Sequence, residues 1–224
     1  RNMSEFDIVI PMSSSTIKND IEQSTEKDYF LNLFNLSQED FLVVYCGNIG
    51  YQTDFDTIFK SAHLLHKNTN IKFIIAGSGP RLDYYKRRYM SSDNIRFVGW
   101  LDGANLNILM KLASIGLISY RNEINFLLNI PNKFPDYLAY GIPILCGLKG
   151  EMGSITESAN CGFVYEEGNH TQLSSLIEYL FNNPKLKNEL SINCLRVHRD
   201  MFDSEKNLIK FSNFLEEVAK KYHA

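Results

Sequence analysis

The residues best suited to chemistry lie between Asn129 and Gly141, where a loop leads into a short predicted helix. A proline, an amide and a lysine open this helix at Pro131, Asn132 and Lys133. A lysine at a helix N-terminus is disfavoured by the helix dipole, so Lys133 needs another reason for its position. A phosphate group docked on the same N-terminus would be one, because such termini bind anions. The alternative is a solvated lysine at the edge of a loop.

Asp136 lies one turn inside the same predicted helix, which Gly141 ends. A carboxylate accepts hydrogen bonds well from two vicinal hydroxyl groups, and the ribose of a nucleotide offers such a pair. The segment therefore favours a nucleotide-sugar site with Lys133 on a phosphate and Asp136 on the ribose. Asp136 could equally be an ordinary acidic residue of a first helical turn, which the dipole favours.

Two glycine-rich turns follow predicted strands and offer room for a ligand. The first, Gly47-Asn48-Ile49-Gly50, leads into a long predicted helix, so its backbone can approach an anion such as a diphosphate. Simple turn chemistry after a strand is the alternative. The second, Gly77-Ser78-Gly79-Pro80, resembles part of a dinucleotide-binding fingerprint. It lacks the third glycine, and position 97, where an acidic ribose ligand would stand, is Phe, so we do not expect a dehydrogenase.

Four other side chains have a functional and a structural interpretation. Trp100 either packs against a nucleotide base or fills the core, and Glu151 either approaches the sugar or starts the next helix. His63 and His66 have no acidic or cysteine partner at metal spacing, so we expect surface or half-buried histidines and no metal site. No Ser–His–Asp arrangement is readable, which leaves hydrolase chemistry without support.

The composition is that of an ordinary soluble protein with one large domain. Of 224 residues, 44% are apolar and 22% charged, and the net charge is −3 without a dominant basic block, so a nucleic-acid-binding role has little support. Cys46 and Cys146 lie inside apolar runs and no CxxC pair occurs, which predicts buried thiols and a reducing, cytoplasmic setting. No long apolar run and no signal peptide is present, so we expect no membrane span.

Hydrophobic periodicity predicts the elements that must position these residues. Short apolar runs that suit buried strands alternate with stretches of helical spacing. The predicted strands are 41–46, 71–76, 95–98, 115–120, 143–146 and 162–165, and the helices between them are 55–66, 81–90, 105–113, a short one that ends at 141, and 154–159. This rhythm predicts a doubly wound α/β layer with a parallel sheet, in which ligands bind at the carboxyl ends of the strands.

The two ends of the chain have other patterns. After Gly168 only helices are predicted, at 171–181, 184–199 and 204–222. The last of them carries an apolar stripe, which we expect to pack on this domain unless an absent domain covers it; the stripe consists of Leu208, Phe211, Leu215 and Val218. Near the N-terminus, residues 8–11 resemble a short strand and 29–36 a helix.

Five short motifs occur in one order along the chain. They are Gly47 through Gln52, the turn at 77–80, Phe97-Val98-Gly99, Pro131 through Pro143, and Gly150-Glu151. This ordered set resembles the C-terminal domain of GT-B retaining glycosyltransferases of family 4, notably bacterial members that build capsule, O-antigen and other surface polysaccharides. The resemblance covers about residues 5–222. It implies a Rossmann-like GT-B half that binds a nucleotide diphosphate sugar, with UDP-sugar as the first expectation, while a separate N-terminal domain holds the acceptor.

Within this resemblance, two acidic positions can be carried over. Family members have two acidic residues eight positions apart, and the second, which holds the ribose, corresponds to Asp136, with Asp in place of the usual Glu. The first, which contacts the donor sugar, corresponds to Leu128, which cannot take that role. Glu123 or Asn125 are the candidates to replace it.

The first glycine-rich loop also departs from the family pattern. The Arg and Lys that commonly grip the diphosphate are replaced by Asn48 and Thr53, so Lys133 and Arg121 are the remaining nearby cations. We therefore expect Lys133 to be the catalytic group, which stabilises the departing nucleoside diphosphate. The expected substrate-binding residues are Gly47, Asn48, Gly50, Gly77, Gly79, Trp100, Arg121, Asn132, Asp136 and Glu151.

The resulting hypothesis is the donor half of a retaining glycosyltransferase, inactive alone. Residues 1–40 would lead in from a missing N-terminal acceptor domain, 41–168 would bind the nucleotide sugar, and 169–224 would pack on or back across the domain. No metal or other cofactor is expected, since the family typically needs none and no Asp-x-Asp motif occurs. A peripheral contact with a lipid acceptor at the inner face of the membrane, through the missing domain, is a further expectation.

Two alternatives belong to other functional classes. A sugar-nucleotide epimerase of the same shape would need catalytic acids beside the donor sugar, and Leu128 at the usual acidic position argues against it. A non-catalytic partner subunit of another transferase would tolerate both the missing acid and the missing cations.

Overall fold

The computed structural model describes residues 8, 10, 11, 13, 14 and 24–222. Among these residues, six strands form one sheet in which every neighbouring pair is parallel. The strands are β1 (Phe41–Cys46), β2 (Ile71–Ala76), β3 (Ile95–Gly99), β4 (Ala113–Ile118), β5 (Ile144–Cys146) and β6 (Gly162–Val164). Their order is β3-β2-β1-β4-β5-β6, so the winding reverses between β1 and β4. The predicted doubly wound α/β fold is confirmed.

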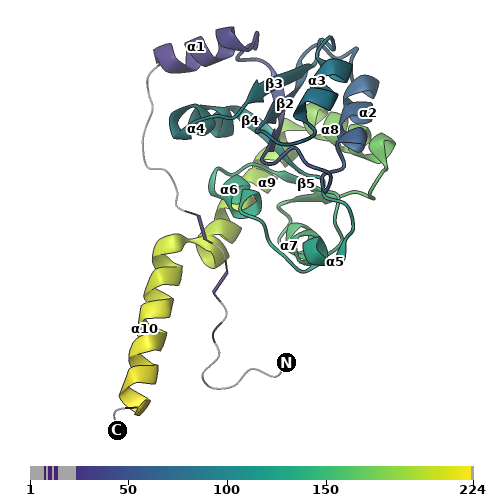
Figure 1. Cartoon of the computed structure of the whole chain (residues 1–224). Helices are drawn as coiled ribbons and strands as arrows, with labels where there is room; N and C mark the ends of the chain where they lie inside the picture. The colour runs from purple at the N-terminus through teal and green to yellow at the C-terminus, as the bar shows by residue number, and fades with distance from the viewer. Residues whose placement is uncertain (1–7, 9, 12, 15–23, 223–224) are drawn as a thin grey trace.

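Helices alternate with the strands and lie on both sides of the sheet (Figure 1). α1 (Ser24–Leu33) precedes β1, and between the strands lie α2 (Phe55–Leu64), α3 (Leu82–Tyr89), α4 (Gly103–Leu112), α5 (Ile124–Leu127), α6 (Lys133–Ala139) and α7 (Glu151–Ser158). After β6 come α8 (His170–Asn182), α9 (Pro184–Val197), a π-helical turn at His198–Phe202, and α10 (Ser204–Tyr222). The C-terminal run of helices is therefore confirmed as well.

Successive side chains of each strand point to opposite faces of the sheet. On β1, Val43 and Tyr45 belong to the core that α2 and α8 cover. Leu42 and Val44 point the other way, into a cluster that includes Phe30 of α1 and residues of α4. Both faces are buried, which explains why the strands are continuous apolar runs in the sequence. A third cluster joins β5 to α6, α7 and α9, and it fixes the helix that carries Lys133.

Three local features differ from the predicted elements. The fourth strand ends at Ile118, so Tyr120 belongs to the loop at its carboxyl end. The helix expected at 154–159 already begins at Glu151, because Gly150 takes the extended backbone of an N-cap residue. The strand expected at 8–11 falls partly outside the described residues, and its described positions, 8, 10 and 11, lie in no strand.

α10 projects away from the sheet (Figure 1). Leu208 is 67% exposed and Phe211 41%, so the expectation that this apolar stripe packs on the domain is wrong. The stripe lacks a partner within the described residues because the helix leaves the domain after the π-helical turn. No described helix is both long and apolar enough to span a lipid bilayer.

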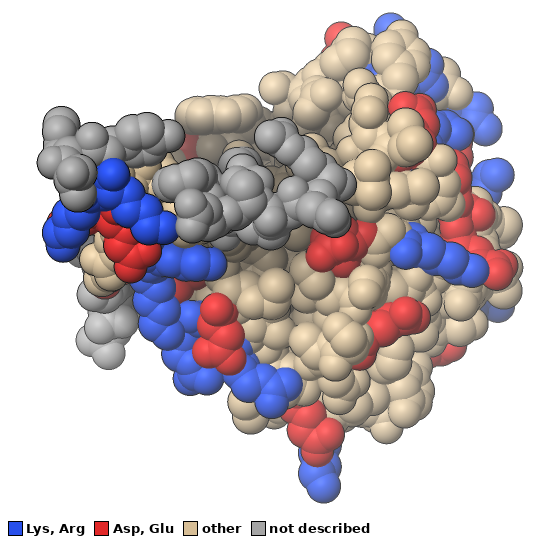
Figure 2. Space-filling model, turned by 90° about the horizontal axis from the view of Figure 1, so that it is seen from below, with Lys and Arg blue, Asp and Glu red and all other residues tan. Residues whose placement is uncertain are grey.

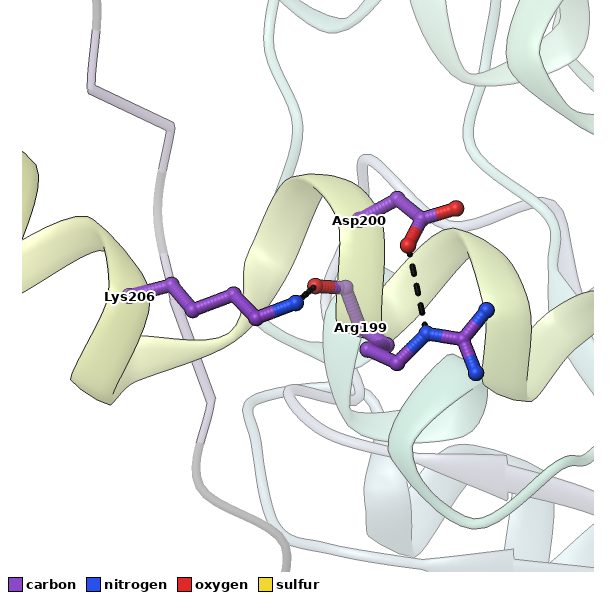
Figure 3. Close-up of polar contacts among 3 residues, drawn as sticks. All are labelled: Arg199, Asp200 and Lys206. Atoms are coloured by element: carbon purple, nitrogen blue, oxygen red, sulfur yellow. Dashed lines mark hydrogen bonds and ion pairs between the residues drawn. The ribbon is translucent and has the colours of Figure 1, made fainter.

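Polar contacts join α10 to the π-helical turn before it. The Nζ of Lys206 donates to the carbonyl O of Arg199 (3.1 Å), and Arg199 Nε donates to Asp200 Oδ1 (3.2 Å), as Figure 3 shows. Such exposed contacts contribute little to stability.

On the face seen from below, Lys and Arg are interspersed with Asp and Glu (Figure 2). This face therefore has a mixed charge.

Candidate functional site

A cavity of about 870 Å³ opens at the carboxyl ends of β1, β2 and β4, where the strand order reverses. Doubly wound sheets bind their ligands at this position. Its lining includes the loops after β1, β2, β3 and β4 and the segment 129–133 with Asp136. Seven of the predicted site residues meet here: Gly47, Asn48, Gly77, Trp100, Asn132, Lys133 and Asp136. The cavity also has the size of small-ligand pockets in general.

The loops after β1 and β2 contact each other through glycine backbones. Gly47 and Gly77 have φ values of +139° and +134°, and a Cβ atom on Gly77 would overlap the carbonyl group of Gly47. Their N–H groups donate within the fold, Gly47 to Ala76 O (2.9 Å) and Gly77 to Gly99 O (2.6 Å). These glycines therefore shape the floor of the cavity, and their amides are already paired.

Gly50 and Gly79 do not line the cavity. A Cβ atom on Gly79 would lie 2.5 Å from Asn48 Oδ1 and 2.5 Å from the carbonyl O of Ile49. Gly50 is buried, and a Cβ there would lie 2.9 Å from Asn48 Nδ2. Both glycines lie against Asn48 and support its loop, and their expected contact with substrate stays a prediction.

Lys133 is the first residue of α6, and its Nζ atom is buried beneath the cavity. Within the described structure this atom has no hydrogen-bond partner. It lies 3.9 Å from the centroid of the Tyr45 ring and 4.7 Å from that of Tyr120. A Cβ on Gly47 would come within 3.1 Å of it. Burial lowers the pKa of Lys133 from its ordinary 10.5 to about 7. The alternative of a solvated lysine at a loop edge is therefore wrong.

Asp136 faces the same cavity from the next turn of α6. Its carboxyl group is half-buried, and burial raises its pKa, while the nearby His198 acts in the opposite direction. Among the described residues that line the cavity, Asp136 supplies the single carboxylate and Lys133 the single ammonium group. One short helix thus presents a cation and an anion to the cavity.

Two residues that were expected to contact the substrate, Arg121 and Glu151, do not line the cavity. The Arg121 side chain is exposed, and its Nε donates to the carbonyl O of Tyr51 (3.2 Å), outside the cavity lining. Glu151 is exposed at the start of α7 and does not line the cavity either. Glu151 is the first residue of α7, as its structural interpretation expects. For both residues, the expected substrate contact stays a prediction.

The structure also shows where the other residues lie for which the sequence left two interpretations open. Trp100 is 74% exposed at the cavity, so it does not fill the core. Leu128 is 80% exposed, and neither Glu123 nor Asn125 lines the cavity. His63 and His66 are exposed, as predicted. Among the described residues no group of three or more His, Cys, Asp or Glu could hold a metal ion.

Two tyrosines that were not predicted from the sequence also matter for the site: Tyr120 lines the cavity, and Tyr137 holds α6 to β1. Tyr120 follows β4, and its ring stacks on Phe126 with 4.5 Å between centroids and 5° between planes. Tyr137 of α6 donates its hydroxyl to the carbonyl O of Val44 (3.2 Å) and accepts from the Cys46 N–H (3.0 Å). An aromatic residue just after a buried strand was the available signal for Tyr120. No such signal marked Tyr137, because the sequence does not distinguish a tyrosine of this helix from an ordinary core residue.

The cysteines have no catalytic geometry. All four are free thiols, and Cys46, which lies at the cavity, has its pKa raised to about 12, chiefly by burial. A thiol of that pKa is protonated at neutral pH and is a poor nucleophile. The prediction of buried thiols is confirmed for Cys146, and Cys46 is only partly buried.

A parallel doubly wound sheet, with a cavity where its strand order reverses, defines the class of Rossmann-like α/β domains, which bind their ligands at that point. Within that class, the chain belongs to the glycosyl transferases group 1 family, whose model matches residues 32–195. This confirms the resemblance to GT-B glycosyltransferases.

A curated relative and several solved structures are similar to the chain. Chitobiosyldiphosphodolichol beta-mannosyltransferase of Dictyostelium discoideum is 26% identical over 144 residues, which are 63% of this chain and 28% of the relative. Sucrose-phosphate synthase from Thermosynechococcus elongatus has a TM-score of 0.74 at 15% identity, covering 95% of this chain and 52% of its own. Anabaena HepE in complex with UDP has a TM-score of 0.71 at 14% identity, and the match covers 87% of this chain and 53% of the HepE chain. The chain thus spans about half of these structures.

Proposed function

We propose that this chain is the donor-binding half of a retaining glycosyltransferase of family 4, with a nucleotide diphosphate sugar, UDP-sugar first, as its ligand. The observation that carries the proposal is the buried Lys133 Nζ, which has no hydrogen-bond partner in the described structure and lies beneath a cavity that Asp136 also lines. Buried charges in proteins are normally paired, so an anionic ligand is the natural partner of this ammonium group. Anabaena HepE, a structural neighbour, has been solved with UDP and with UDP-glucose.

In the proposed complex, Lys133 contacts the diphosphate and Asp136 accepts hydrogen bonds from the ribose hydroxyls. During transfer the bond between the sugar C1 and the β-phosphate oxygen breaks, and an acceptor hydroxyl oxygen bonds to C1 on the same face while its O–H bond breaks and its proton is released to solvent. The nucleoside diphosphate leaves with the negative charge of the broken bond. Lys133 stabilises that charge, which is electrostatic catalysis at the leaving group. The proposal requires no metal ion and no other cofactor.

The proposed acceptor is a polysaccharide or a lipid-linked sugar of a bacterial surface. The acceptor-binding domain would be a further part of the protein, consistent with the half-length match to the solved neighbours. The exposed stripe of α10 gives the chain an apolar surface toward such a domain. We propose that a lipid acceptor at the inner face of the membrane is reached through that domain.

The test is a calorimetric titration of the chain with UDP and with GDP. We expect binding of one of them, and we expect Asp136→Ala to weaken it by about 1.5–3 kcal/mol, the cost of removing hydrogen bonds to a charged group. Asp83→Ala is the matched control, since Asp83 is an exposed carboxylate of α3 away from the cavity. Absence of binding at millimolar nucleotide contradicts the donor role. Equal affinities of Asp136→Ala and Asp83→Ala contradict the ribose assignment.

A second candidate is a non-catalytic partner subunit of another transferase. The observation that favours it is the exposed Leu128 together with a cavity lining in which Asp136 is the one carboxylate among the described residues. The same observation disfavours an epimerase, which needs acids at the donor sugar. Such a subunit would bind the nucleotide with the affinity of a donor domain, but the complete protein would show neither transfer nor hydrolysis of the donor.

A further inference from the structure

The surroundings of Lys133 are aromatic and uncharged. Tyr45 and Tyr120 place their ring faces 3.9 Å and 4.7 Å from Nζ, a distance at which a cation is attracted by the negative face of the ring. The ion pairs found among the described residues do not include Lys133. The amine is therefore enclosed by two aromatic faces and lacks a counter-charge.

Both rings are held in place by other contacts. The Tyr45 hydroxyl donates to the carbonyl O of Asn48 (2.7 Å) and shares a hydrogen bond with Thr53 Oγ1 (3.0 Å). Thr53 in turn forms an isolated β-bridge with Tyr120, whose ring stacks on Phe126. The loops after β1 and β4 are thereby joined around the amine. We call Tyr45 and Tyr120 the aromatic cage.

Few groups near the amine can change its charge. The titratable or charged side chains that face it from the neighbouring elements are Tyr45, Cys46, Tyr120, Asp136 and Tyr137. Burial raises the pKa of the three tyrosines and of Cys46, so these groups are neutral at physiological pH. Asp136 lies on the same helix and makes no ion pair with the lysine. The loss of hydration on burial outweighs the attraction of the two rings for a cation and lowers the pKa of Lys133 to about 7, so most of the amine is uncharged at pH 8.

We propose that Tyr45 and Tyr120 are positioning residues, which keep the Lys133 amine enclosed until the donor's diphosphate supplies its counter-charge, so that nucleotide binding takes up a proton. This inference rests on the proposed function, because it assumes that a diphosphate binds in this cavity. The proton comes from the solvent and ends on Nζ as ammonium, which then faces the phosphate oxygens. Lys133 is then the cation at the diphosphate, since Asn48 and Thr53 stand where loop cations would be expected.

The test is calorimetry of the whole chain with UDP, or with GDP if that is the nucleotide bound, at pH 8 in two buffers of different ionisation enthalpy, Tris and HEPES. We expect an uptake of about one proton per nucleotide, and an affinity that falls about tenfold per pH unit between pH 7.5 and 9. Lys133→Met should abolish both. If the wild-type chain binds the nucleotide without proton uptake, the inference is wrong and the proposed function stands. If neither nucleotide binds, both are wrong.

Two variants of one position test the cage itself. Tyr120→Phe keeps the ring face and should retain the proton uptake. Tyr120→Leu removes it and admits water to the amine, which then stays protonated at pH 8; we expect nucleotide binding without proton uptake and without the fall of affinity with pH. Tyr179→Leu, at an exposed tyrosine of α8, is the matched control for a lost aromatic ring. Retention of proton uptake by a folded Tyr120→Leu variant would overturn the positioning role of Tyr120.

Discussion

The hydroxyl of Tyr137 lies 3.0 Å from the backbone nitrogen of Cys46, whose N–H it accepts, and 3.2 Å from the carbonyl O of Val44, to which it donates. α6 is therefore bonded directly to the end of β1. The ring lies over Gly116 of β4, where a Cβ atom would come within 2.5 Å of it. This contact sets the distance between the helix that carries Lys133 and Asp136 and the loop that begins at Gly47.

Tyr137→Phe is expected to lower the free energy of unfolding by about 1–3 kcal/mol, because it leaves a buried N–H without a partner. Urea unfolding followed by circular dichroism measures this. Tyr179→Phe serves as the control, since Tyr179 is 49% exposed. Equal stability of the two variants would show that the Tyr137 hydroxyl is replaceable, and α6 would then be held by apolar packing alone.

Gly77→Ala is expected to be severely destabilising. The new Cβ overlaps the carbonyl of Gly47, and a φ of +134° is unfavourable for alanine. The control is Gly103→Ala at the first position of α4, where a Cβ meets nothing within 4 Å. That control should raise stability by up to about 1 kcal/mol, because alanine is the better helix former. Thermal unfolding distinguishes them, and a Gly77→Ala variant as stable as wild type would contradict the close approach of the two loops.

The fold could be predicted because buried parallel strands leave continuous apolar runs. The runs at 41–46 and 71–76 match β1 and β2 to the residue. Ligands bind at the carboxyl ends of such strands, and this general rule predicted one site for Gly47, Gly77 and Lys133. All three residues line the same cavity. Chain order and sheet topology were sufficient for this part, because neither depends on the direction of individual side chains.

Side-chain direction was the part that sequence could not supply. Arg121 follows a strand at the correct edge of the sheet, yet its guanidinium contacts the Tyr51 carbonyl. Lys133 was selected by its place at a helix start, but its enclosure by Tyr45 and Tyr120 depends on two loops that meet only in the folded chain. The outward course of α10 was missed for a related reason, since an amphipathic pattern does not reveal what covers the apolar face.

Lys133 is expected to give the stability of the chain a pH dependence. Its pKa is about 7 in the folded chain and 10.5 ordinarily, so between pH 7 and 9 the unfolded chain holds a proton that the folded chain lacks. Stability rises with pH wherever the unfolded state binds more protons, here by up to about 1.4 kcal/mol per pH unit. Above pH 9 the sign reverses, because burial raises the pKa of Cys46 and Cys146 to about 12.

The measurement is urea unfolding at a series of pH values from 6.5 to about 9, the window that these pKa values set. Lys133→Met, which keeps the length of the side chain and removes the amine, should flatten the rise and should be more stable than wild type near pH 7. Lys149→Met is the control, since Lys149 is an exposed lysine after β5. A rise that persists unchanged in Lys133→Met would mean that another group titrates.

Deletion of α10 is expected to leave the domain folded. Its stripe residues Leu208, Phe211 and Leu215 are 41–67% exposed, so their removal uncovers little apolar surface in the rest of the chain. A chain that ends at Asp203 should therefore keep the thermal midpoint of the full chain within a few degrees, about the shift of a 1 kcal/mol change. A chain that ends at Asn183 should instead unfold, because it loses α9 with the buried Leu190 and Cys194. A large loss of stability on removing α10 alone would show that its apolar stripe packs on this domain in solution.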